Sequence, residues 1–291
     1  MRGLIIVNPY QVDGGNNHQA QRLKEEFSKL GVSVEILSCG YKLNRLVNSN
    51  LEFLEEKPDF VVFLDKDKYL SASLEKAGVR LFNADKPIRL CDDKGETVIA
   101  LANAGIPMPN TMFAPLCYNE KAEITLDDAK AVIDTLSLPV IVKESYGSLG
   151  VGVYKADTTK ELLALMQKLK TEPHIYQEYV GYKKGTDVRV IVIGGKVVCA
   201  MQRSNDVDFR SNLACGGTGT AITLDKEFTE VAEKTAKLLQ LDYCGIDLLY
   251  GKDGKPVVCE VNSNAFFRGV EGVTKVNVAK TYAEYIINAL K

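Results

Sequence analysis

The sequence contains no tryptophan, only two histidines, and no pair of cysteines with the spacing of a metal or redox motif. Its seven cysteines are scattered singly, and an odd number spaced in this way argues against both a disulfide framework and a zinc site. With His18 and His174 alone, neither a histidine-based metal centre nor a Ser-His-Asp triad has enough residues. Lysines and oxygen-bearing side chains must therefore carry any chemistry.

An excess of charge of either sign is also missing. The 36 Lys and Arg residues oppose 38 Asp and Glu residues, so the net charge of -2 offers no electrostatic footprint for a nucleic acid. No basic head with a long apolar core opens the chain, and no later run reaches the roughly 18 apolar residues of a membrane span. We therefore expect a globular, cytoplasmic protein with neither a nucleic-acid partner nor a membrane partner.

What is present is enough apolar material for a sizeable core: 291 residues, of which 46% are hydrophobic. In the first 90 residues short apolar runs alternate with an amphipathic segment, which predicts a βαβ arrangement and an N-terminal α/β domain over 1–90. The predicted strands cover 4–7, 32–37, 60–64 and 79–82, and the predicted helix covers 19–30. The loop over 8–17 follows the first strand, where open α/β sheets place ligands. It lacks the GxGxxG pattern, so a dinucleotide site there has little support.

The remaining chain divides into two lobes, predicted over 91–178 and 179–291. In the first lobe we expect helices over 94–104 and 126–136, strands over 139–143, 152–156 and 175–180, and a helix opened by the capping box Thr158-x-x-Glu161. In the second lobe we expect two hairpins, over 186–203 and 243–262, and helices over 226–239 and 276–290. The whole chain is therefore of the α/β class, with α+β lobes.

The pair Asp253-Gly254 stands between two apolar runs and predicts a two-residue hairpin turn. Counting outward from that turn places Asp247 opposite Glu260, and Asn262 lies two residues further along on the same face. Opposed carboxylates repel each other unless a positive charge offsets them, and Mg²⁺ is bound by hard oxygen ligands of this kind. We interpret this face as a magnesium platform; the alternative is a solvated acidic face of the sheet.

A second hairpin turn is predicted at Gly194-Gly195, which pairs Asp187 with Gln202. Asp187 and Arg189 then share one face at the open end of the strand, and the valines between and beyond them take the opposite, buried face. The polar pair is turned either toward a cleft or toward water.

Two further segments are candidates for phosphate binding. Lys143 ends a buried strand directly before the glycine-rich segment 145–152, where backbone N–H groups can approach phosphate oxygens closely. The alternative is an ordinary turn between strands, because no Walker A pattern is present. The polar segment 210–217 begins with Arg210, which either neutralises a transferring phosphoryl group or a tetrahedral intermediate, or is a surface arginine in a flexible loop.

The order of these motifs resembles the ATP-grasp enzymes, and within them the RimK-type ligases that add glutamate or related amino acids to peptides and cofactors. The resemblance covers roughly 94–262. It is carried by the blocks GTDVRV (185–190), DFRSN (208–212) with a glycine pair at 216–217, GID (245–247) and EVN (260–262). It implies an ATP-grasp fold with an N-terminal Rossmann-like pre-ATP-grasp domain over 1–90, a first lobe with a glycine-rich lid over 91–178, and a second lobe with the metal site over 179–291.

The resemblance also implies roles for individual residues. The ATP phosphates would be contacted by Lys94 and Lys143 and covered by a lid that includes Gly147, Ser148 and Gly150. The adenine would be read by the hinge strand Gln177, Glu178, Tyr179 and Val180, and the ribose held by Asp187. The γ-phosphate would lie near Arg210, Ser211 and Asn212, and one or two Mg²⁺ (or Mn²⁺) ions would be bound by Asp247, Glu260 and Asn262.

The implied activity is an ATP- and magnesium-dependent ligation. ATP phosphorylates a carboxylate, an amine of an amino acid or peptide substrate attacks the acyl phosphate, and Arg210 stabilises the developing oxyanion. ATP-grasp ligases often pair, so a homo-oligomer is implied as well. Two alternatives remain on the same scaffold, a phosphotransferase that acts on a hydroxyl and a nucleotide-binding module without catalysis.

The sequence departs from the family pattern after the metal residues. Members that act on ribosomal protein commonly have the sequence Asn-x-Ser-Pro-Gly at this place. In this chain Asn262 is followed by the sequence SNAFFRG over 263–269. Either this turn shapes an acceptor pocket, with Arg203 or Arg268 pairing a substrate carboxylate, or its residues serve packing and the surface. The ribosomal substrate is therefore not transferred to this chain.

Overall fold

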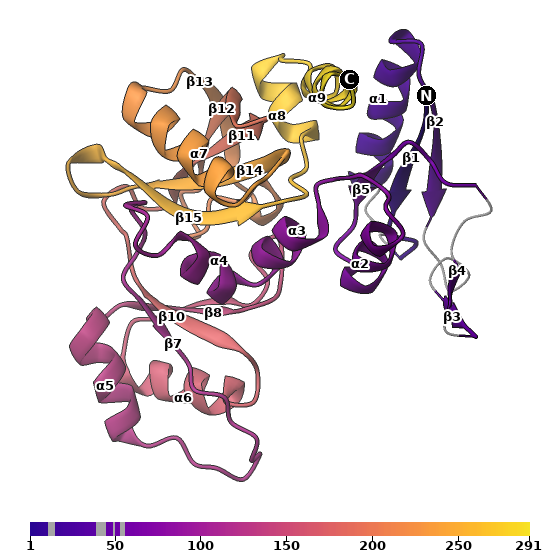
Figure 1. Cartoon of the computed structure of the whole chain (residues 1–291). Coiled ribbons are helices and arrows are strands. Elements are labelled where there is room, and N and C mark those ends of the chain that lie inside the picture. Colours follow the sequence, from indigo (N-terminus) through magenta and orange to yellow (C-terminus); the bar gives the residue numbers. More distant parts are fainter. Residues whose placement is uncertain (11–14, 39–44, 49, 53–55) are drawn as a thin grey trace.

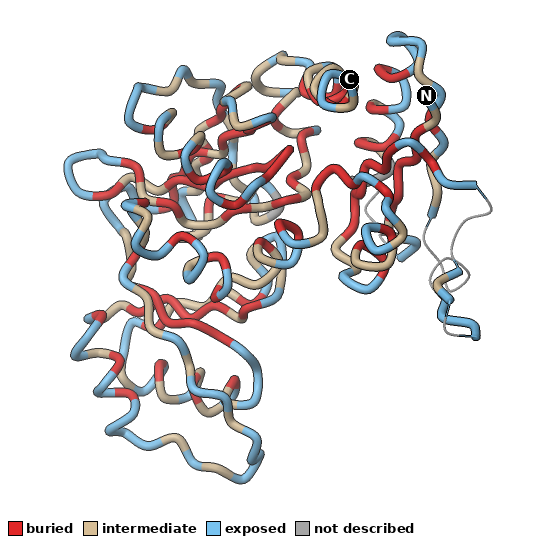
Figure 2. Tube along the Cα trace, viewed as in Figure 1, coloured by how far each residue is buried: buried red, intermediate tan, exposed pale blue. Residues whose placement is uncertain are grey.

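The computed structural model describes residues 1–10, 15–38, 45–48, 50–52 and 56–291, with the side chains of 15–17 and 214 left aside. Three units follow one another along the chain: an N-terminal unit with a parallel sheet, a middle lobe, and a large lobe that ends in the C-terminal helices (Figure 1). Buried residues run along the strands of all three units (Figure 2). None of the described helices is both long and apolar enough to cross a membrane.

The N-terminal unit is built on four parallel strands in the order β2-β1-β5-β6. Its elements are β1 (Arg2–Val7), α1 (Gly15–Lys29), β2 (Ser33–Ser38), the short ribbon β3 (Arg45–Val47) and β4 (Asn50–Glu52), β5 (Phe60–Leu64), α2 (Lys68–Lys76) and β6 (Leu81–Phe82). Both faces of β1 and β5 are covered, which is why each strand reads as a continuous apolar run. The parallel pairing of β1 with β2 around α1 confirms the predicted βαβ arrangement. Of the predicted ligand loop over 8–17, positions 11–14 lie outside the described residues.

The middle lobe is an antiparallel sheet in the order β7-β10-β8-β9, with two helices packed on one face (Figure 1). Its elements are β7 (Thr111–Phe113), α5 (Leu126–Leu136), β8 (Val140–Glu144), β9 (Val153–Ala156), α6 (Thr159–Leu169) and β10 (His174–Glu178). The predicted capping box at Thr158 and Glu161 is present at the start of α6. The other face of the sheet contacts α4 (Lys94–Leu101) and presents Ile141, Lys143 and Gln177 to a cavity.

The large lobe contains a five-stranded antiparallel sheet in the order β13-β12-β11-β14-β15. Its elements are β11 (Thr186–Ile193), β12 (Lys196–Ser204), the 3-10 turn Leu213–Cys215, β13 (Thr218–Ile222), α7 (Lys226–Leu238), β14 (Tyr243–Tyr250), the 3-10 turn Lys252–Gly254, β15 (Pro256–Asn262), α8 (Arg268–Thr274) and α9 (Val278–Ala289). Helix α7 covers one face of this sheet, and α8 and α9 cover the other. Strand β13 and helix α8 were not predicted from the sequence.

The units are joined by shared cores. One hydrophobic cluster contains Phe27 of α1 and Tyr282 of α9, so the C-terminal helix packs against the N-terminal unit. Helices α3 (Asp85–Asp92) and α4 (Lys94–Leu101) lead from the first unit to the second, and the predicted boundary after residue 90 lies inside α3. Helix α4 is shorter than the predicted 94–104 because the backbone becomes extended at Ala102. The limits of the three units stay predictions, while their three sheets follow the predicted order.

The hairpin at residues 253–254 differs from its prediction near the turn. The strands are joined through the 3-10 turn, and Leu248 faces Val258 rather than Cys259. A β-bulge between Asp247 and Leu248 then shifts the register by one residue. The predicted pair of Asp247 with Glu260 is therefore confirmed, although the intermediate pairs were wrong.

The hairpin at residues 194–195 also carries a bulge. Ile193 pairs with Lys196, but the register shifts between Ile191 and Val192. Asp187 consequently faces Arg203 and not Gln202 as predicted. This shift of one residue brings a guanidinium group opposite the carboxylate.

Candidate active site

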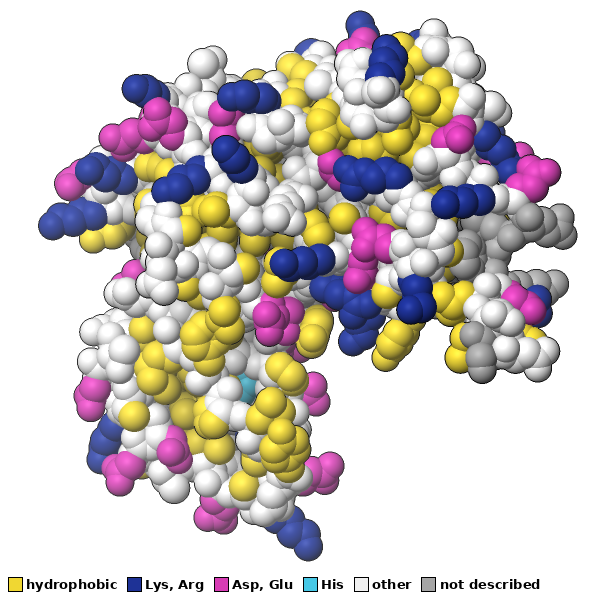
Figure 3. Space-filling model, viewed as in Figure 1, with side chains coloured by type: hydrophobic (Ala, Val, Ile, Leu, Met, Phe, Trp, Pro, Cys, Tyr) yellow, Lys and Arg dark blue, Asp and Glu magenta, His cyan; other side chains and the backbone are white. Residues whose placement is uncertain are grey.

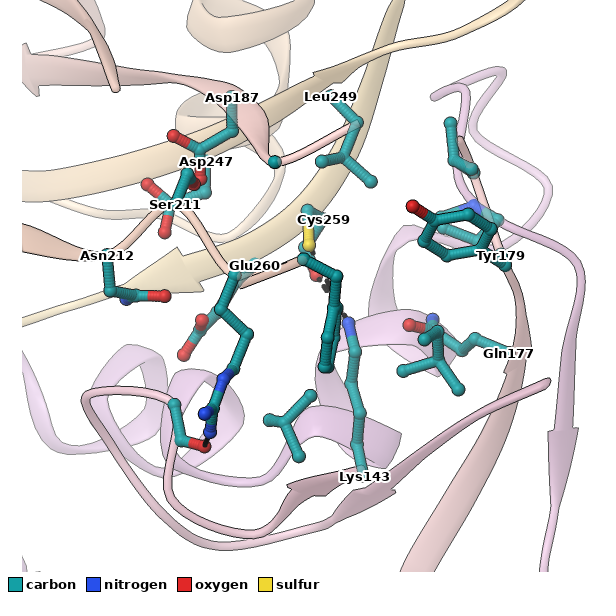
Figure 4. Close-up of a pocket in the computed structure, with 18 of the residues that line it drawn as sticks. Lys143, Gln177, Tyr179, Asp187, Ser211, Asn212, Asp247, Leu249, Cys259 and Glu260 are labelled. Carbon is teal, nitrogen blue, oxygen red and sulfur yellow. Dashed lines mark hydrogen bonds between the residues drawn. The ribbon is translucent and has the colours of Figure 1, made fainter. Parts of the chain in front are cut away.

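Two neighbouring cavities lie where the units meet, and Figure 3 shows an open notch between the middle lobe and the N-terminal unit. The first cavity lies between the sheets of the middle and large lobes (Figure 4). Among the residues predicted from the sequence, it is lined by Lys94, Lys143, Gly150, Gln177, Glu178, Tyr179, Val180, Asp187, Arg210, Ser211, Asn212, Asp247 and Glu260. The structure thus brings together groups that are more than 160 residues apart in the chain.

The second cavity lies beside the first and receives residues from all three units. Its lining comprises Asn8, Tyr10, Asp65, Lys66, Ser148, Leu149, Arg189, Met201, Arg203, Asn212, Leu213, Glu260, Asn262, Asn264, Ala265, Phe266 and Gly269. Asn212 and Glu260 line both cavities. A ligand bound in one cavity can therefore contact a ligand bound in the other beside Asn212 and Glu260.

Two lysines enter the first cavity from different elements. Lys143, on β8, is 7% exposed, and its ammonium donates to the carbonyl oxygen of Cys259 at 3.4 Å. Lys94 begins α4, and its ammonium donates to the carbonyl oxygen of Gly147 at 3.1 Å. Burial lowers the pKa of Lys94, and Lys143 lowers it further, although Glu260 opposes this. Two cations held this close in a partly buried site are suited to an anionic ligand such as a phosphate chain.

The glycine loop, residues 145–152, connects β8 to β9 and contacts both cavities. Gly147 and Gly150 have φ angles of +137° and +83°, which side-chain-bearing residues rarely adopt. The loop is tied to the large lobe because Arg210 donates to the Gly150 carbonyl oxygen at 2.9 Å. It is tied to the N-terminal unit because Lys66 donates to the Ser148 hydroxyl at 3.2 Å. The glycine loop thus contributes residues to both cavities, and its role as a lid stays a prediction.

The end of β10 provides an unsatisfied acceptor in the first cavity. The Gln177 side chain is 2% exposed and its amide nitrogen donates to the Thr111 hydroxyl at 3.0 Å, but its amide oxygen has no hydrogen-bond partner. The amide N–H of the next residue, Glu178, donates to the carbonyl oxygen of Asn110 at 3.0 Å. A buried acceptor without a donor is costly, so this position suits a ligand that carries an N–H group.

A chain of four alternating charges crosses strands β12, β11 and β14; we refer to Arg189, Asp247, Arg203 and Asp187 as the charge chain. Arg189 donates to both Asp247 oxygens, at 2.8 Å for the Nη2 to Oδ2 contact. Arg203 donates to Asp247 Oδ2 at 2.9 Å and to Asp187 Oδ1 at 2.7 Å. Burial favours a higher pKa for Asp247, but the two guanidinium groups hold its pKa below the usual range. Asp247 is therefore ionised at neutral pH.

These contacts correct one step of the sequence argument for a metal. A divalent cation was inferred as the group that offsets the paired carboxylates, yet for Asp247 the two arginines already do so. The side chain of Glu260 differs, because no arginine binds its carboxylate within the described part of the chain, and its charge acts on Lys94 instead. No group of three or more His, Cys, Asp or Glu side chains with metal-site geometry occurs among the described residues.

A magnesium site at this face is nevertheless compatible with the donors present. Asp247 and Glu260 stand opposite each other and line the first cavity, while Asn262 and Glu260 line the second. Two carboxylates beside an amide oxygen are a ligand set that Mg²⁺ accepts, with phosphate and water completing its shell. Figure 4 shows the amide of Asn212 and the carboxylate of Glu260 turned toward each other.

The two arginines predicted to pair a substrate carboxylate have different positions. Arg203 lines the second cavity but is buried and bound to two carboxylates. Arg268 begins α8, is exposed and lines neither cavity, so the structure lends no support to its predicted role. Phe266 lines the second cavity, whereas Phe267 is fully buried in the core.

Sequence reasoning missed several residues of the second cavity. Asp65 and Lys66 follow β5 directly, at the same edge of the parallel sheet as Asn8. The rule that ligands bind beyond the carboxyl ends of parallel strands would have found them. Arg189 was seen only as part of a polar strand face, because its partner Asp247 belongs to another hairpin.

Comparison with known proteins shows what this chain is similar to. Residues 91–286 match the family model described as the RimK-like ATP-grasp domain. The human beta-citrylglutamate synthase B is 36% identical over 228 residues, which are 78% of this chain and 58% of the synthase. The human N-acetylaspartylglutamate synthase A is 34% identical over 228 residues, covering 78% of this chain and 57% of that protein. The chain thus spans a little over half the length of these two synthases.

A solved structure extends the comparison to the whole fold. The ATP-grasp ligase PsnB, in a structure with a minimal precursor, Mg and ADP, superimposes with a TM-score of 0.72 at 19% identity. The match covers 99% of this chain and 97% of that one. At this identity the likeness shows a shared fold.

Proposed function

This chain belongs to the RimK-like ATP-grasp family, and we propose that it is an ATP- and magnesium-dependent ligase that joins a carboxylate to an amine. The observation that carries this proposal is the pair of cavities that meet at Glu260 and Asn212. A ligase of this kind needs one site for the nucleotide and an adjoining site for the acyl and amine substrates, with the transferred phosphoryl group at the border. The relatives named above are synthases, which supports the same class of reaction.

In the first cavity we assign nucleotide binding to groups at its two ends. Lys94 and Lys143 bind the phosphates, covered by the glycine loop with Gly147, Ser148 and Gly150. The orphaned Gln177 oxygen accepts from the adenine amino group, and the backbone of Glu178, Tyr179 and Val180 lines the adenine. Asp187 lies at the ribose, and Arg210, Ser211 and Asn212 lie at the γ-phosphate. The lowered pKa of Lys94 and the unsatisfied Gln177 acceptor are the local observations that support this orientation.

The residues at the border between the cavities perform the transfer. Asp247, Glu260 and Asn262 hold magnesium, which neutralises charge on the phosphates when it is bound. A substrate carboxylate oxygen attacks the γ-phosphorus and ADP leaves, after which the amine attacks the acyl carbon and phosphate leaves. Arg210 stabilises the charge that develops on the transferred group and on the acyl oxygen. Arg210 Nη2 now lies 2.7 Å from Asp208 Oδ2. In this role Arg210 gives up part of that contact and donates to the transferred group.

The amine substrate is proposed to be glutamate or another amino acid. Both human relatives are named for products that contain glutamate, and the second cavity of this chain presents Lys66, Arg189 and Arg203 to a substrate that carries carboxylates. The acyl partner is a carboxylic acid, either a small molecule or a peptide. The protein is further proposed to act in the cytoplasm as a homo-oligomer.

The test is a matrix of carboxylic acids and amino acids, scored by release of phosphate from ATP and followed by mass measurement of the product. A ligase releases phosphate only when both an acid and an amine are present, and the product mass equals the sum of the two less one water. A phosphorylated product would instead identify a phosphotransferase. ATP binding with no turnover for any pair would favour the non-catalytic alternative.

A further inference from the structure

The charge chain presents its negative groups to one cavity and its positive groups to the other. Its carboxylates, Asp187 and Asp247, line the first cavity, and its guanidinium groups, Arg189 and Arg203, line the second. This arrangement follows from the positions of the residues in three adjacent strands, in which Arg189 faces Asp247 and Asp187 faces Arg203. The four side chains form the wall between the proposed nucleotide side and the proposed substrate side.

The carboxylate of Asp247 can bind either the two arginines or a cation in the first cavity. The side chain is 3% exposed and receives hydrogen bonds from Arg189 on both oxygens and from Arg203 on one. A cation that binds this carboxylate must share its lone pairs with these donors or displace some of them. A guanidinium group that loses such a bond inside the protein needs another acceptor, because an unsatisfied buried cation is costly.

We propose that Arg189 and Arg203 compete with the divalent cation for Asp247, and that cation binding releases their N–H groups to form the carboxylate-binding site of the second cavity. This inference rests on the proposed function, since it assigns the substrate-recognition residues of the same site. The ligand is the carboxylate of the acyl or amino-acid substrate, which a guanidinium group binds with paired hydrogen bonds. Cation and carboxylate then bind with positive coupling, which is reciprocal by thermodynamic necessity.

If the arginines compete with the cation, removing one of them should strengthen cation binding and not weaken it. Replacing Arg189 by glutamine removes two donors from Asp247 and leaves this carboxylate freer to bind a metal ion. The affinity for the cation should therefore increase in Arg189→Gln. A purely structural role for Arg189 predicts the opposite, because loss of the ion pair would disorder Asp247 and weaken the metal site.

The first experiment titrates Mn²⁺ against the full chain saturated with ADP and follows free Mn²⁺ by electron paramagnetic resonance. We expect the Mn²⁺ dissociation constant of Arg189→Gln to be lower than that of the wild type by about fivefold or more, the lower end of typical coupling between sites. Arg189→Lys keeps the charge but has fewer donors, so its Mn²⁺ dissociation constant should decrease by less. If Arg189→Gln does not fold, the Mn²⁺ affinity of Arg189→Lys tests the proposal. Unchanged or weaker Mn²⁺ binding in the folded variant would overturn the proposal.

A matched control separates this effect from the general loss of an ion pair. Arg80 is bound to Asp242, at 3.0 Å, on the surface between the N-terminal unit and the large lobe, and it lines neither cavity. Arg80→Gln should leave the Mn²⁺ dissociation constant at the wild-type value. A change of equal size in this variant would attribute the effect to stability and contradict the competition.

The second experiment tests the ligand class. Binding of acetate, succinate and glutarate is measured by calorimetry with saturating ADP, once with excess EDTA and once with excess Mg²⁺, and uncharged succinamide serves as the control. We expect at least one carboxylate to bind about fivefold more tightly with Mg²⁺, and succinamide to show no such gain. If Mg²⁺ and ADP bind but no carboxylate gains affinity, this inference fails alone; if Mg²⁺ and ADP do not bind, the proposed function fails with it.

Discussion

Asp247 stands directly opposite Glu260 across β14 and β15, and a β-bulge beside this pair inserts Cys259 as an extra residue in β15. The bulge turns both Cys259 and Glu260 toward the first cavity, although they are consecutive in a strand. Cys259 then offers its carbonyl oxygen to the Lys143 ammonium at 3.4 Å. One irregularity in the sheet therefore positions the carboxylate pair and a lysine together.

Glu260 is expected to be a principal ligand of magnesium, since among the described residues no arginine binds its carboxylate, whereas two arginines bind Asp247. Glu260→Gln should raise the Mg²⁺ concentration needed for half-maximal turnover by roughly 10- to 100-fold, a range seen even for groups that only support a metal ligand. The measurement is a magnesium titration of phosphate release at saturating ATP. Asp253→Asn, a change in the turn of the same hairpin, is the matched control and should keep the wild-type requirement.

Arg210 is expected to act on the transition state more than on nucleotide binding. Arg210→Ala should lower kcat by about 100- to 1,000-fold, the usual effect of removing one group that stabilises developing charge. ADP affinity, measured by calorimetry, should change little because Lys94 and Lys143 remain. Turnover equal to that of the wild type would refute the assignment. Arg45→Ala, in the exposed ribbon of β3 and β4, serves as the control for loss of an arginine.

The pH dependence of nucleotide binding should reveal Lys94. Burial and neighbouring cations lower the pKa of Lys94 in the free protein, whereas bound phosphates would raise it again. Binding at alkaline pH must therefore take up a proton, and ADP affinity should fall as the pH rises through the free-state pKa. In Lys94→Arg, whose side chain stays protonated, the decline should flatten. A wild-type affinity that is constant up to pH ~10, near the ordinary lysine pKa, would contradict this prediction.

The stability of the middle lobe should depend on His174. This residue is 5% exposed, and its ring nitrogens contact the Glu172 carbonyl oxygen and the Tyr176 hydroxyl, both at 2.7 Å. The carbonyl requires a proton on Nδ1, so the neutral ring accepts from the hydroxyl at Nε2.

Burial lowers the pKa of His174 below its usual value of about 6.5, so the unfolded chain binds a proton more readily than the folded one. The stabilising contribution is therefore complete above that value and is lost as the pH falls through the folded-state pKa. The free energy of unfolding of the wild type should decrease between about pH 7.5 and pH 5.5. His174→Gln should show a flatter profile by urea denaturation. Equal slopes for His174→Gln and the wild type would count against this account.

The order of the elements and the faces of the strands could be predicted from the sequence, because both are encoded by short periods. Alternation in β14 places Asp247 on one face and the buried Ile246 and Leu248 on the other, as the structure shows. Capping residues fixed the start of α6 at Thr158 in the same local way. These features depend on residues within a few positions of one another, so no knowledge of the fold is needed to see them.

Only the tertiary structure decided which charges meet. Arg189 and Asp247 lie 58 positions apart and become partners because β11 and β14 are neighbours in the sheet. Lys66 reaches Ser148, 82 positions away, because the N-terminal unit packs beside the glycine loop. The sequence alone therefore determined a carboxylate face suited to a cation, while the fold determined that two arginines share that face. The physical reason is that strand neighbours, bulges and contacts between units arise from packing over the whole chain. A short sequence pattern does not encode that packing.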